Sequence, residues 1–367
     1  MKILISAYSF FPKIGGIETF TDVLATTFVN MGHSVILMTP VEHSLKKDEA
    51  PYTIIRKPSP LRCLELFEWC DIFYQSNVSL RLAWPLLLVP KPLFITHHIW
   101  PEGKQYPNDK PNSDTLFARF RHMCIEKPFI NLKNLCKDLL CSLAHTLAVS
   151  SFMDTCFNQK SFVLPNMYQD TLFYPRPHIP RHKDLIFVGR LVEEKGVQCA
   201  LEALRILQTE GYAPSLSIVG VGEQRDHLEA LSKAYGLEKT VAFLGALEGE
   251  ALAESYCQHS IQLIPSLWPE PFGLVALEGI ACGCVPIGSE GGGLQETIGP
   301  CGLTFPNANA RALANRIRYL LDHPQKQSYY QSPAKEHLEQ FSSRRIAEQY
   351  IDFFKSKTDI QDEIYSF

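Results

Sequence analysis

The 367 residues lack several features that would mark a metal-dependent, disulfide-bonded or nucleic-acid-binding protein. No Asp-x-Asp pair occurs, so the sequence offers no carboxylate pair of the kind that holds a metal ion beside a phosphate group. The 11 cysteines form no Cys-x-x-Cys pair and are odd in number, which indicates reduced thiols in a cytoplasmic protein rather than a disulfide framework. The net charge of -4 is small and argues against a nucleic-acid partner held by bulk electrostatics.

Long hydrophobic runs are missing as well. The apolar run at 82–95 is interrupted by prolines and a lysine and is too short to span a bilayer, so no transmembrane segment is predicted. Residues 1–6 contain a short apolar stretch that leads to no cleavage-like small-residue site, and we expect a first buried strand there rather than a signal peptide. We therefore expect a cytoplasmic protein, with peripheral contact to the inner face of a membrane as the alternative.

Predicted strands and helices alternate along the chain, which is typical of parallel sheets covered on both faces. Strands are predicted at 2–6, 34–39, 52–56, 71–74, 93–96, 146–149 and 162–164, and then at 185–188, 216–219, 241–243, 261–264 and 285–288. A polar, proline-rich stretch between the two groups is typical of a domain linker. We therefore predict an N-terminal domain over 1–165, a linker over 166–184 and a C-terminal domain over 185–342.

The segment 270–278, Glu-Pro-Phe-Gly-Leu-Val-Ala-Leu-Glu, places two carboxylates around the start of a predicted helix. Prolines exclude a helix before Gly273, so Glu270 lies on a loop and Glu278 lies one turn inside the helix. The free backbone N–H groups at the helix start are those of Phe272, Gly273, Leu274 and Val275. Such a helix end binds anions, and a carboxylate further along can accept hydrogen bonds from sugar hydroxyls. The segment therefore predicts a site for a diphosphate and its neighbouring sugar.

This segment resembles the E-x7-E signature of retaining glycosyltransferases of the GT-B fold, in particular family 4 (glycosyl transferases group 1), which uses nucleotide-sugar donors. Further stretches of the family pattern follow in order at 15–18 (Gly-Gly-Ile-Glu), 187–190 (Phe-Val-Gly-Arg), 194–196 (Glu-Lys-Gly) and 292–296 (Gly-Gly-Leu-Gln-Glu). The resemblance implies an α/β protein with two Rossmann-like domains whose parallel sheets face each other across a cleft. The N-terminal domain would bind the acceptor and be completed by a C-terminal helix over 343–367, and the C-terminal domain would bind the donor.

The resemblance also implies roles for individual residues. Arg190 and Lys195 would bind the donor diphosphate together with the amides at the helix start. Glu278 would bind the ribose of the nucleotide. Gly15 and Gly16 would let the N-terminal loop approach the diphosphate closely.

Two residues are candidate catalytic residues beside the transferred sugar, Glu270 and His98. His97 and His98 end a predicted strand, where neighbouring side chains point to opposite faces, so at most one of them faces a ligand. Relatives often show Thr-x-His at this place, which matches Thr96 and His98, and His97 would then be packed or solvated. A zinc site is disfavoured because no third His or Cys lies at ligand spacing nearby.

The implied activity is transfer of a sugar from a UDP- or GDP-sugar to a hydroxyl of a glycan, lipid-linked or small-molecule acceptor, with retention at the anomeric carbon. We expect no metal and no cofactor, because cationic side chains and amides would neutralise the departing diphosphate. Two alternatives stay open. One is another GT-B enzyme, such as a sugar-nucleotide epimerase or a glycoside phosphorylase, and the other is a catalytically silent nucleotide-sugar-binding module.

The region between residues 101 and 141 contains no motif of the family, so the sequence does not identify the acceptor. Within it, the segment 110–137 interleaves basic and aromatic residues. One hypothesis is a membrane-surface patch that serves a lipid-linked acceptor. A solvated amphipathic helix pair is the interpretation that we favour.

A further glycine-rich stretch, Gly220-Val221-Gly222, follows a predicted strand. It lacks the third glycine of the dinucleotide-binding fingerprint, and no acidic residue is evident on a succeeding strand. We expect a tight strand-to-helix turn there rather than an NAD site.

Overall fold

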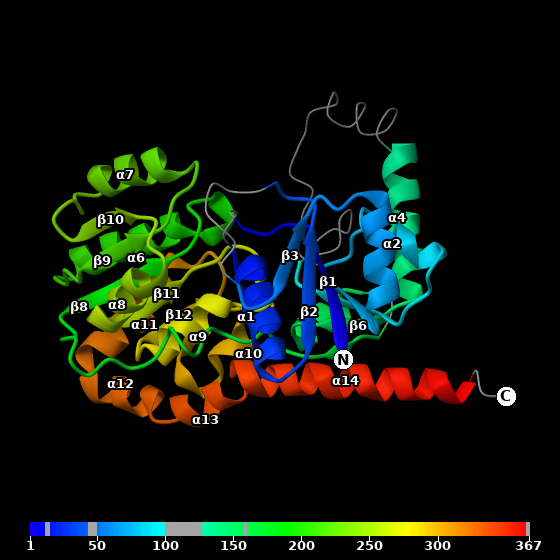
Figure 1. The fold of residues 1–367 in the computed structure, drawn as a ribbon. Coiled ribbons are helices and arrows are strands. Elements are labelled where there is room, and N and C mark those ends of the chain that lie inside the picture. Colours follow the sequence, from blue (N-terminus) through cyan, green and yellow to red (C-terminus); the bar gives the residue numbers. More distant parts are fainter. Residues whose placement is uncertain (12–14, 43–49, 100–126, 158–159, 365–367) are drawn as a thin grey trace. The chain divides into compact units, whose positions relative to one another are not determined.

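The computed structural model describes residues 1–11, 15–42, 50–99, 127–157 and 160–364 (Figure 1). The chain divides into two compact units. The first unit consists of Met1–Leu164 and Ala347–Phe367, and the second consists of Pro165–Ile346. The ten cysteines in the described ranges are all free thiols.

The first unit contains a sheet of seven parallel strands in the order β3-β2-β1-β4-β5-β6-β7. These strands are β1 (Lys2–Ala7), β2 (Ser34–Thr39), β3 (Thr53–Arg56), β4 (Ile72–Ser76), β5 (Leu93–His97), β6 (His145–Ala148) and β7 (Phe162–Val163). Each strand predicted for this half is present, because short apolar runs suit a sheet that is covered on both faces. The strand order reverses between β1 and β4, and open α/β sheets bind ligands at the carboxyl ends of strands beside such a reversal.

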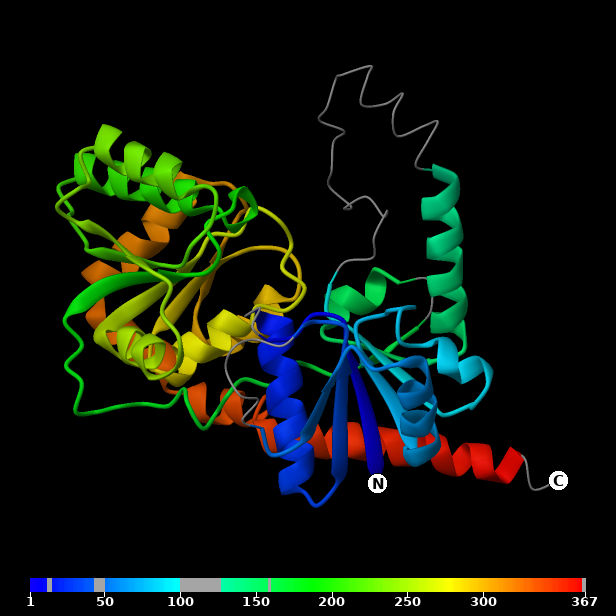
Figure 2. The ribbon, with the colours of Figure 1, turned by 45° about the horizontal axis from the view of Figure 1, so that its top comes forward.

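Helices cover this sheet (Figure 2). They are α1 (Gly16–Asn30), α2 (Pro60–Trp69), α4 (Lys127–Ser142), α5 (Ser151–Thr155) and most of α14 (Ser343–Ile364). Helix α1 buries Phe20, Leu24 and Phe28, which are spaced by four residues and form one face. Residues 110–126 of the basic and aromatic segment lie outside the described residues, and its remainder falls in α4. In the described part of the chain, no helix has the length and apolar character needed to cross a bilayer.

The last helix supplies core residues to the first unit. Tyr350 and Phe354 of α14 are fully buried. The Tyr350 ring centroid lies 5.8 Å from that of Tyr74, and the Phe354 ring centroid lies 4.5 Å from that of Phe94. The Tyr350 hydroxyl also lies 3.0 Å from Thr96 Oγ1. Aromatic packing of this kind explains why a segment late in the chain is part of the first unit.

The second unit contains a sheet of six parallel strands in the order β10-β9-β8-β11-β12-β13. Its strands are β8 (Lys183–Val188), β9 (Leu216–Val219), β10 (Val241–Gly245), β11 (His259–Ile264), β12 (Val285–Ser289) and β13 (Leu303–Phe305). Its helices are α6 (Val197–Thr209), α7 (Arg225–Ala234), α8 (Gly249–Gln258), α9 (Leu274–Ala281), α10 (Leu294–Ile298), α11 (Ala310–Asp322), α12 (Pro324–Gln331) and α13 (Ala334–Glu339). The sequence did not predict β13, which has only three residues. The strand order reverses between β8 and β11.

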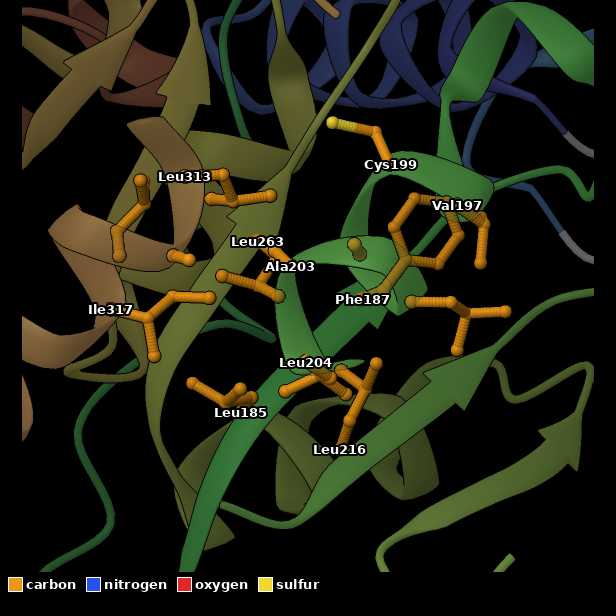
Figure 3. Packing of buried hydrophobic residues seen from close by; sticks show 14 of the residues in the cluster. Leu185, Phe187, Val197, Cys199, Ala203, Leu204, Leu216, Leu263, Leu313 and Ile317 are labelled. Atoms are coloured by element: carbon orange, nitrogen blue, oxygen red, sulfur yellow. The ribbon is translucent and has the colours of Figure 1, made fainter. Parts of the chain in front are cut away.

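The core of the second unit lies between its sheet and the helices α6 and α11 (Figure 3). Leu185 of β8, Leu216 of β9 and Leu204 of α6 are each 2% exposed or less. Leu313 and Ile317 of α11 are fully buried in the same cluster. Truncating one such leucine to alanine typically costs about 2–5 kcal/mol, so this core fixes the frame from which the loops of the unit project.

The segment before β8, where the sequence predicts a linker, is bonded to the second unit. The Arg181 guanidinium donates hydrogen bonds to the carbonyl oxygen of Cys282, at 2.8 Å, and to that of His259. Asp170 accepts hydrogen bonds from the backbone N–H and the hydroxyl of Ser343, at 2.9 and 2.8 Å. These side chains tie both ends of the segment to the second unit.

The stretch Gly220-Val221-Gly222 forms the turn between β9 and α7. Gly220 has a φ of +143°, and a Cβ atom there would lie 1.8 Å from the carbonyl oxygen of Gly189. A Cβ atom at Gly222 would lie 2.3 Å from the carbonyl oxygen of Leu191. The glycines are therefore needed for close approach of two backbone segments, as the expected tight turn requires.

Candidate active site

Two loops meet at the carboxyl ends of the central strands of the second unit. Strands β8 and β11 pair directly, and the order of the sheet reverses between them. Lys195 lies in a short 3-10 helix (Glu193–Lys195) after β8, and Glu270 lies on the loop after β11. Lys195 Nζ donates to Glu270 Oε1 at 2.6 Å. The structure thus brings together two predicted site residues at the place where such sheets bind ligands.

The backbones of these two loops are in close contact. Gly196 has a φ of +66°, and a Cβ atom there would lie 2.0 Å from the carbonyl oxygen of Pro265. The Leu267 N–H donates to the carbonyl oxygen of Glu194 at 2.8 Å. Only glycine allows both this left-handed conformation and this approach. The glycine of the Glu-Lys-Gly motif therefore sets the position of the lysine before it.

Glu270 is held at both its side chain and its backbone. Ser266 Oγ donates to Glu270 Oε1 at 2.5 Å, and the Gly293 N–H donates to the Glu270 carbonyl oxygen at 2.7 Å. Gly292, with a φ of +70°, leaves room for this contact, because a Cβ atom there would lie 2.2 Å from the Glu270 carbonyl oxygen. Ser266 was not among the site residues predicted from the sequence. Its position four residues before Glu270, directly after a buried strand and a proline, was the available signal.

The helix predicted to begin at Gly273 is α9. Gly273 has a φ of +105°, and no side chain caps the helix start. Phe272 is buried, and its carbonyl oxygen accepts a hydrogen bond from Thr297 Oγ1 at 2.7 Å. Leu274 and Val275 are half-buried and form the first turn. The first amides of a helix without a cap can bind an anion.

Glu278 is buried within the second unit. Its side chain is 9% exposed, and the Tyr256 hydroxyl donates to Glu278 Oε2 at 3.4 Å. Burial raises the pKa of the Glu278 carboxyl to about 8, although the hydrogen bond from Tyr256 opposes this shift. At neutral pH the carboxyl is therefore largely protonated, and it can both donate and accept hydrogen bonds.

Arg190 follows β8 directly and has an exposed side chain. It forms no ion pair with any residue in the described ranges, in contrast to Lys195. Its charge is available to a ligand without the loss of an existing partner. Arg190 and Lys195, which were predicted to share one role, therefore differ in the structure, because only Lys195 has an ion-pair partner among the described residues.

Gly15 and Gly16 follow β1 beside the strand reversal in the first unit. Gly15 has an extended conformation and is the N-cap residue of α1. A Cβ atom on Gly15 would lie 2.7 Å from Glu18 Oε2, whereas one on Gly16 would meet no atom within 4 Å. The predicted contact of Gly15 and Gly16 with a diphosphate stays a prediction.

His97 and His98 at the end of β5 are both buried and contact different residues. The His97 ring stacks on Phe157 at 3.9 Å, and the His98 ring lies 4.6 Å from that of Phe20 in α1. The His98 N–H donates to Asn77 Oδ1 at 2.8 Å. His97, which the sequence leaves packed or solvated, is packed against Phe157, and the expected contact of His98 with a sugar stays a prediction.

Metal ligands were not expected from the sequence. Within the described ranges, no three His, Cys, Asp or Glu side chains gather closely enough to hold a metal ion. Metal independence of the reaction stays a prediction.

Comparison with known proteins finds a family model and relatives that match part of the chain. Residues 171–337 match the family model described as "Glycosyl transferases group 1". An uncharacterized glycosyltransferase of Methanocaldococcus jannaschii is 34% identical over 177 residues, which are 47% of this chain and 45% of the relative. A glycogen synthase of Mycobacterium tuberculosis is 35% identical over 143 residues, which are 38% of this chain and 34% of the relative. The chain thus aligns with less than half the length of these two curated relatives.

A solved structure, the Anabaena protein HepE in complex with UDP and glucose, matches with a TM-score of 0.74 at 19% identity, covering 97% of this chain and 100% of that one. This likeness and the two parallel sheets define a protein of the GT-B fold, and the predicted fold class is confirmed. Residues 171–337 are similar to the glycosyl transferases group 1 family, in line with the resemblance of the sequence motifs.

Proposed function

We propose that this protein is a glycosyltransferase of family 4 that moves a sugar from a nucleotide-diphosphate donor to a hydroxyl group, with retention and without a metal ion. The observation that carries the proposal is the ion pair of Lys195 and Glu270 at the reversal between β8 and β11. It brings one cation and one carboxylate to the sheet edge where a nucleotide is expected. The uncapped start of α9 lies after the same strand β11.

The second unit would bind the donor. Arg190, Lys195 and the amides of Phe272 to Val275 would bind the diphosphate, since cations and helix starts both favour phosphate. Glu278 would bind the ribose and Glu270 the transferred sugar. We keep Gly15, Gly16 and His98 of the first unit as predicted contacts of the donor, and we propose that the first unit binds the acceptor.

A UDP-sugar is the donor that we test first, because the HepE structure contains UDP and glucose. A GDP-sugar is the second choice. The acceptor is proposed only as a class, namely the hydroxyl of a glycan, a lipid-linked sugar or a small molecule. Names of curated relatives include both a glycogen synthase and D-inositol 3-phosphate glycosyltransferases, so the family name alone selects no acceptor.

The chemistry assigned to these residues is charge neutralisation. Cleavage at the anomeric carbon leaves a nucleoside diphosphate, and positive groups aimed at it lower the barrier to bond cleavage. In family 4 the acceptor attacks from the side of the leaving group, and the departing phosphate helps to deprotonate it. Retention of configuration is the expected result. A double displacement would instead require a carboxylate below the anomeric carbon.

The test begins with a thermal-shift screen of nucleoside diphosphates and their sugars. Donor hydrolysis is then measured on the compounds that stabilise the protein, and the anomer first formed is identified by proton NMR. We expect a UDP- or GDP-sugar to stabilise the protein and to be hydrolysed slowly to the retained anomer. The rate of hydrolysis is expected to be the same in the presence and absence of a metal chelator. Stabilisation by no compound would refute the proposal.

The same assays separate the alternatives. A sugar-nucleotide epimerase would convert the donor to its epimer, and a phosphorylase would turn over a glycoside with inorganic phosphate. A silent binding module would bind the donor and leave it intact with every acceptor class. None of these outcomes is expected, because cationic and carboxylate positions of the family pattern are all present.

Peripheral membrane contact is a second proposal, and it rests on α4. Leu135, Leu139 and Leu143 are 64%, 60% and 73% exposed and are spaced by four residues, so they form one apolar stripe that extends just past the helix. Lys133 is exposed on the same helix. Sedimentation with vesicles that contain anionic lipid tests this, and Leu139→Ser is expected to weaken binding. Equal sedimentation with neutral and anionic vesicles, or none, would refute it.

A further inference from the structure

Lys195 and Glu270 neutralise each other before any donor is bound. Their side chains are 22% and 10% exposed, so water screens the pair only in part. Both Lys195 Nζ and Ser266 Oγ approach the same carboxylate oxygen, Oε1. Arg190, the other cation assigned to the diphosphate, is exposed and pairs with no described residue. A diphosphate that binds Lys195 must therefore compete with Glu270, whereas one that binds Arg190 competes with no described residue.

Glu270 cannot easily leave Lys195. Ser266 holds the carboxylate, and the Gly293 N–H together with the close approach of Gly292 holds the backbone of Glu270. A diphosphate that binds Lys195 must then share its charge with a fixed carboxylate, and the two anions repel each other. Binding of a nucleoside diphosphate is weakened by that repulsion.

A nucleotide-sugar differs from a nucleoside diphosphate at this place. Glu270 Oε1 has two protein donors, whereas Oε2 has no hydrogen-bond partner in the described ranges. A sugar hydroxyl that donates to Oε2 compensates part of the repulsion, because a hydrogen bond to a charged group is comparatively strong. After transfer the sugar is gone and the repulsion remains.

We propose that Glu270 is an internal counter-ion of Lys195 that competes with the diphosphate, so that the site holds the nucleotide-sugar but releases the nucleoside diphosphate after transfer. This inference rests on the proposed function, because it needs a nucleoside diphosphate as product. Ser266 is then a positioning residue, which acts by keeping Glu270 beside Lys195.

The test is isothermal titration of the full-length protein with UDP and with GDP at fixed ionic strength. Glu270→Gln keeps the shape of the side chain and removes its charge, and we expect it to bind the nucleoside diphosphate about tenfold more tightly than the wild type. Turnover of the nucleotide-sugar is expected to fall in the same variant. Lys195→Met is expected to weaken binding of the nucleoside diphosphate.

Glu193→Gln is the matched control, because Glu193 is an exposed acid in the same 3-10 helix as Lys195. It removes one negative charge nearby and is expected to change the affinity for UDP less than about twofold. A similar gain in affinity for UDP in Glu193→Gln and Glu270→Gln would mean a general effect of negative charge and would overturn the inference.

Ser266→Ala is the second variant and keeps the test open if Glu270→Gln does not fold. It frees Glu270 to move away from Lys195, so we expect about twofold to threefold tighter binding of UDP or GDP. If folded Glu270→Gln and Ser266→Ala bound UDP and GDP no more tightly than the wild type, the inference would be overturned and the proposed function would stand. If the wild type bound no nucleoside diphosphate and no nucleotide-sugar, the proposed function would fail and the inference with it.

Discussion

Replacing Glu278 by glutamine is expected to stabilise the protein at alkaline pH. The carboxyl is buried, and its pKa rises from the ordinary value of 4.5 to about 8. The unfolded chain releases the proton near pH 4.5, whereas the folded protein keeps it up to about pH 8. Folded protein therefore binds more protons in this window, and its stability falls as the pH rises from 4.5 to 8, with no further loss above that.

The size of the effect follows from the same two pKa values. One pKa unit corresponds to about 1.4 kcal/mol. The difference between 4.5 and about 8 thus amounts to roughly 5 kcal/mol of unfolding free energy lost at alkaline pH. Glutamine does not titrate, and it can still accept the hydrogen bond from Tyr256.

Urea unfolding of the full chain at pH 5 to 9 measures this directly. We expect the variant to gain stability over the wild type as the pH rises, because all other titrating groups are shared and cancel in the difference. Glu254→Gln is the control, since Glu254 is exposed on the same helix as Tyr256. A difference between variant and wild type that stays constant over this range would refute the assignment of Glu278 as a buried neutral acid.

Three further predictions concern single residues of the second unit. Gly196→Ala is expected to lower the unfolding free energy by about 3 kcal/mol or more, and Gly211→Ala by about 1 kcal/mol. Both glycines have a positive φ, but only at Gly196 would a Cβ atom clash with a backbone oxygen. Equal losses of the two variants in urea unfolding would contradict this. Burial lowers the pKa of His259 from 6.5 to about 4, so the folded protein loses about 3 kcal/mol as the pH falls from 6.5 to 4. His259→Gln should remove that loss, and parallel acid-unfolding curves would count against it. Arg190→Ala should weaken UDP binding about tenfold and leave the melting temperature unchanged, since the side chain is exposed and unpaired among the described residues; titration and a thermal melt check both.

The sequence predicted those parts of the site that depend on local chemistry. Prolines, Gly273 and Gly283 define where α9 begins and ends, and the structure has the helix at Leu274–Ala281. Short apolar runs defined each strand of the first sheet because burial on both faces requires them. A strand of three residues such as β13 carries too little pattern to be found in this way.

The sequence did not predict which site residues touch. Lys195 and Glu270 are 75 positions apart, and they meet because β8 pairs with β11, a long-range choice that no local motif contains. Ser266 was missed because a single serine after a strand has many structural uses. Glu278 is buried and accepts a hydrogen bond from Tyr256 of α8, and no spacing within 270–278 could indicate that contact.

The position of Tyr350 and Phe354 in the first unit bears on how the chain folds during synthesis. Phe28, Tyr74 and Phe94 are translated early, but Tyr350 and Phe354, whose rings pack on them, are made only after residues 165–346. A ribosome therefore carries an incomplete first unit, with uncovered aromatic surface, for the whole time that the second unit emerges. Chains that stop before Phe354 should bind chaperones and aggregate, even though every residue of the proposed donor site has already been made.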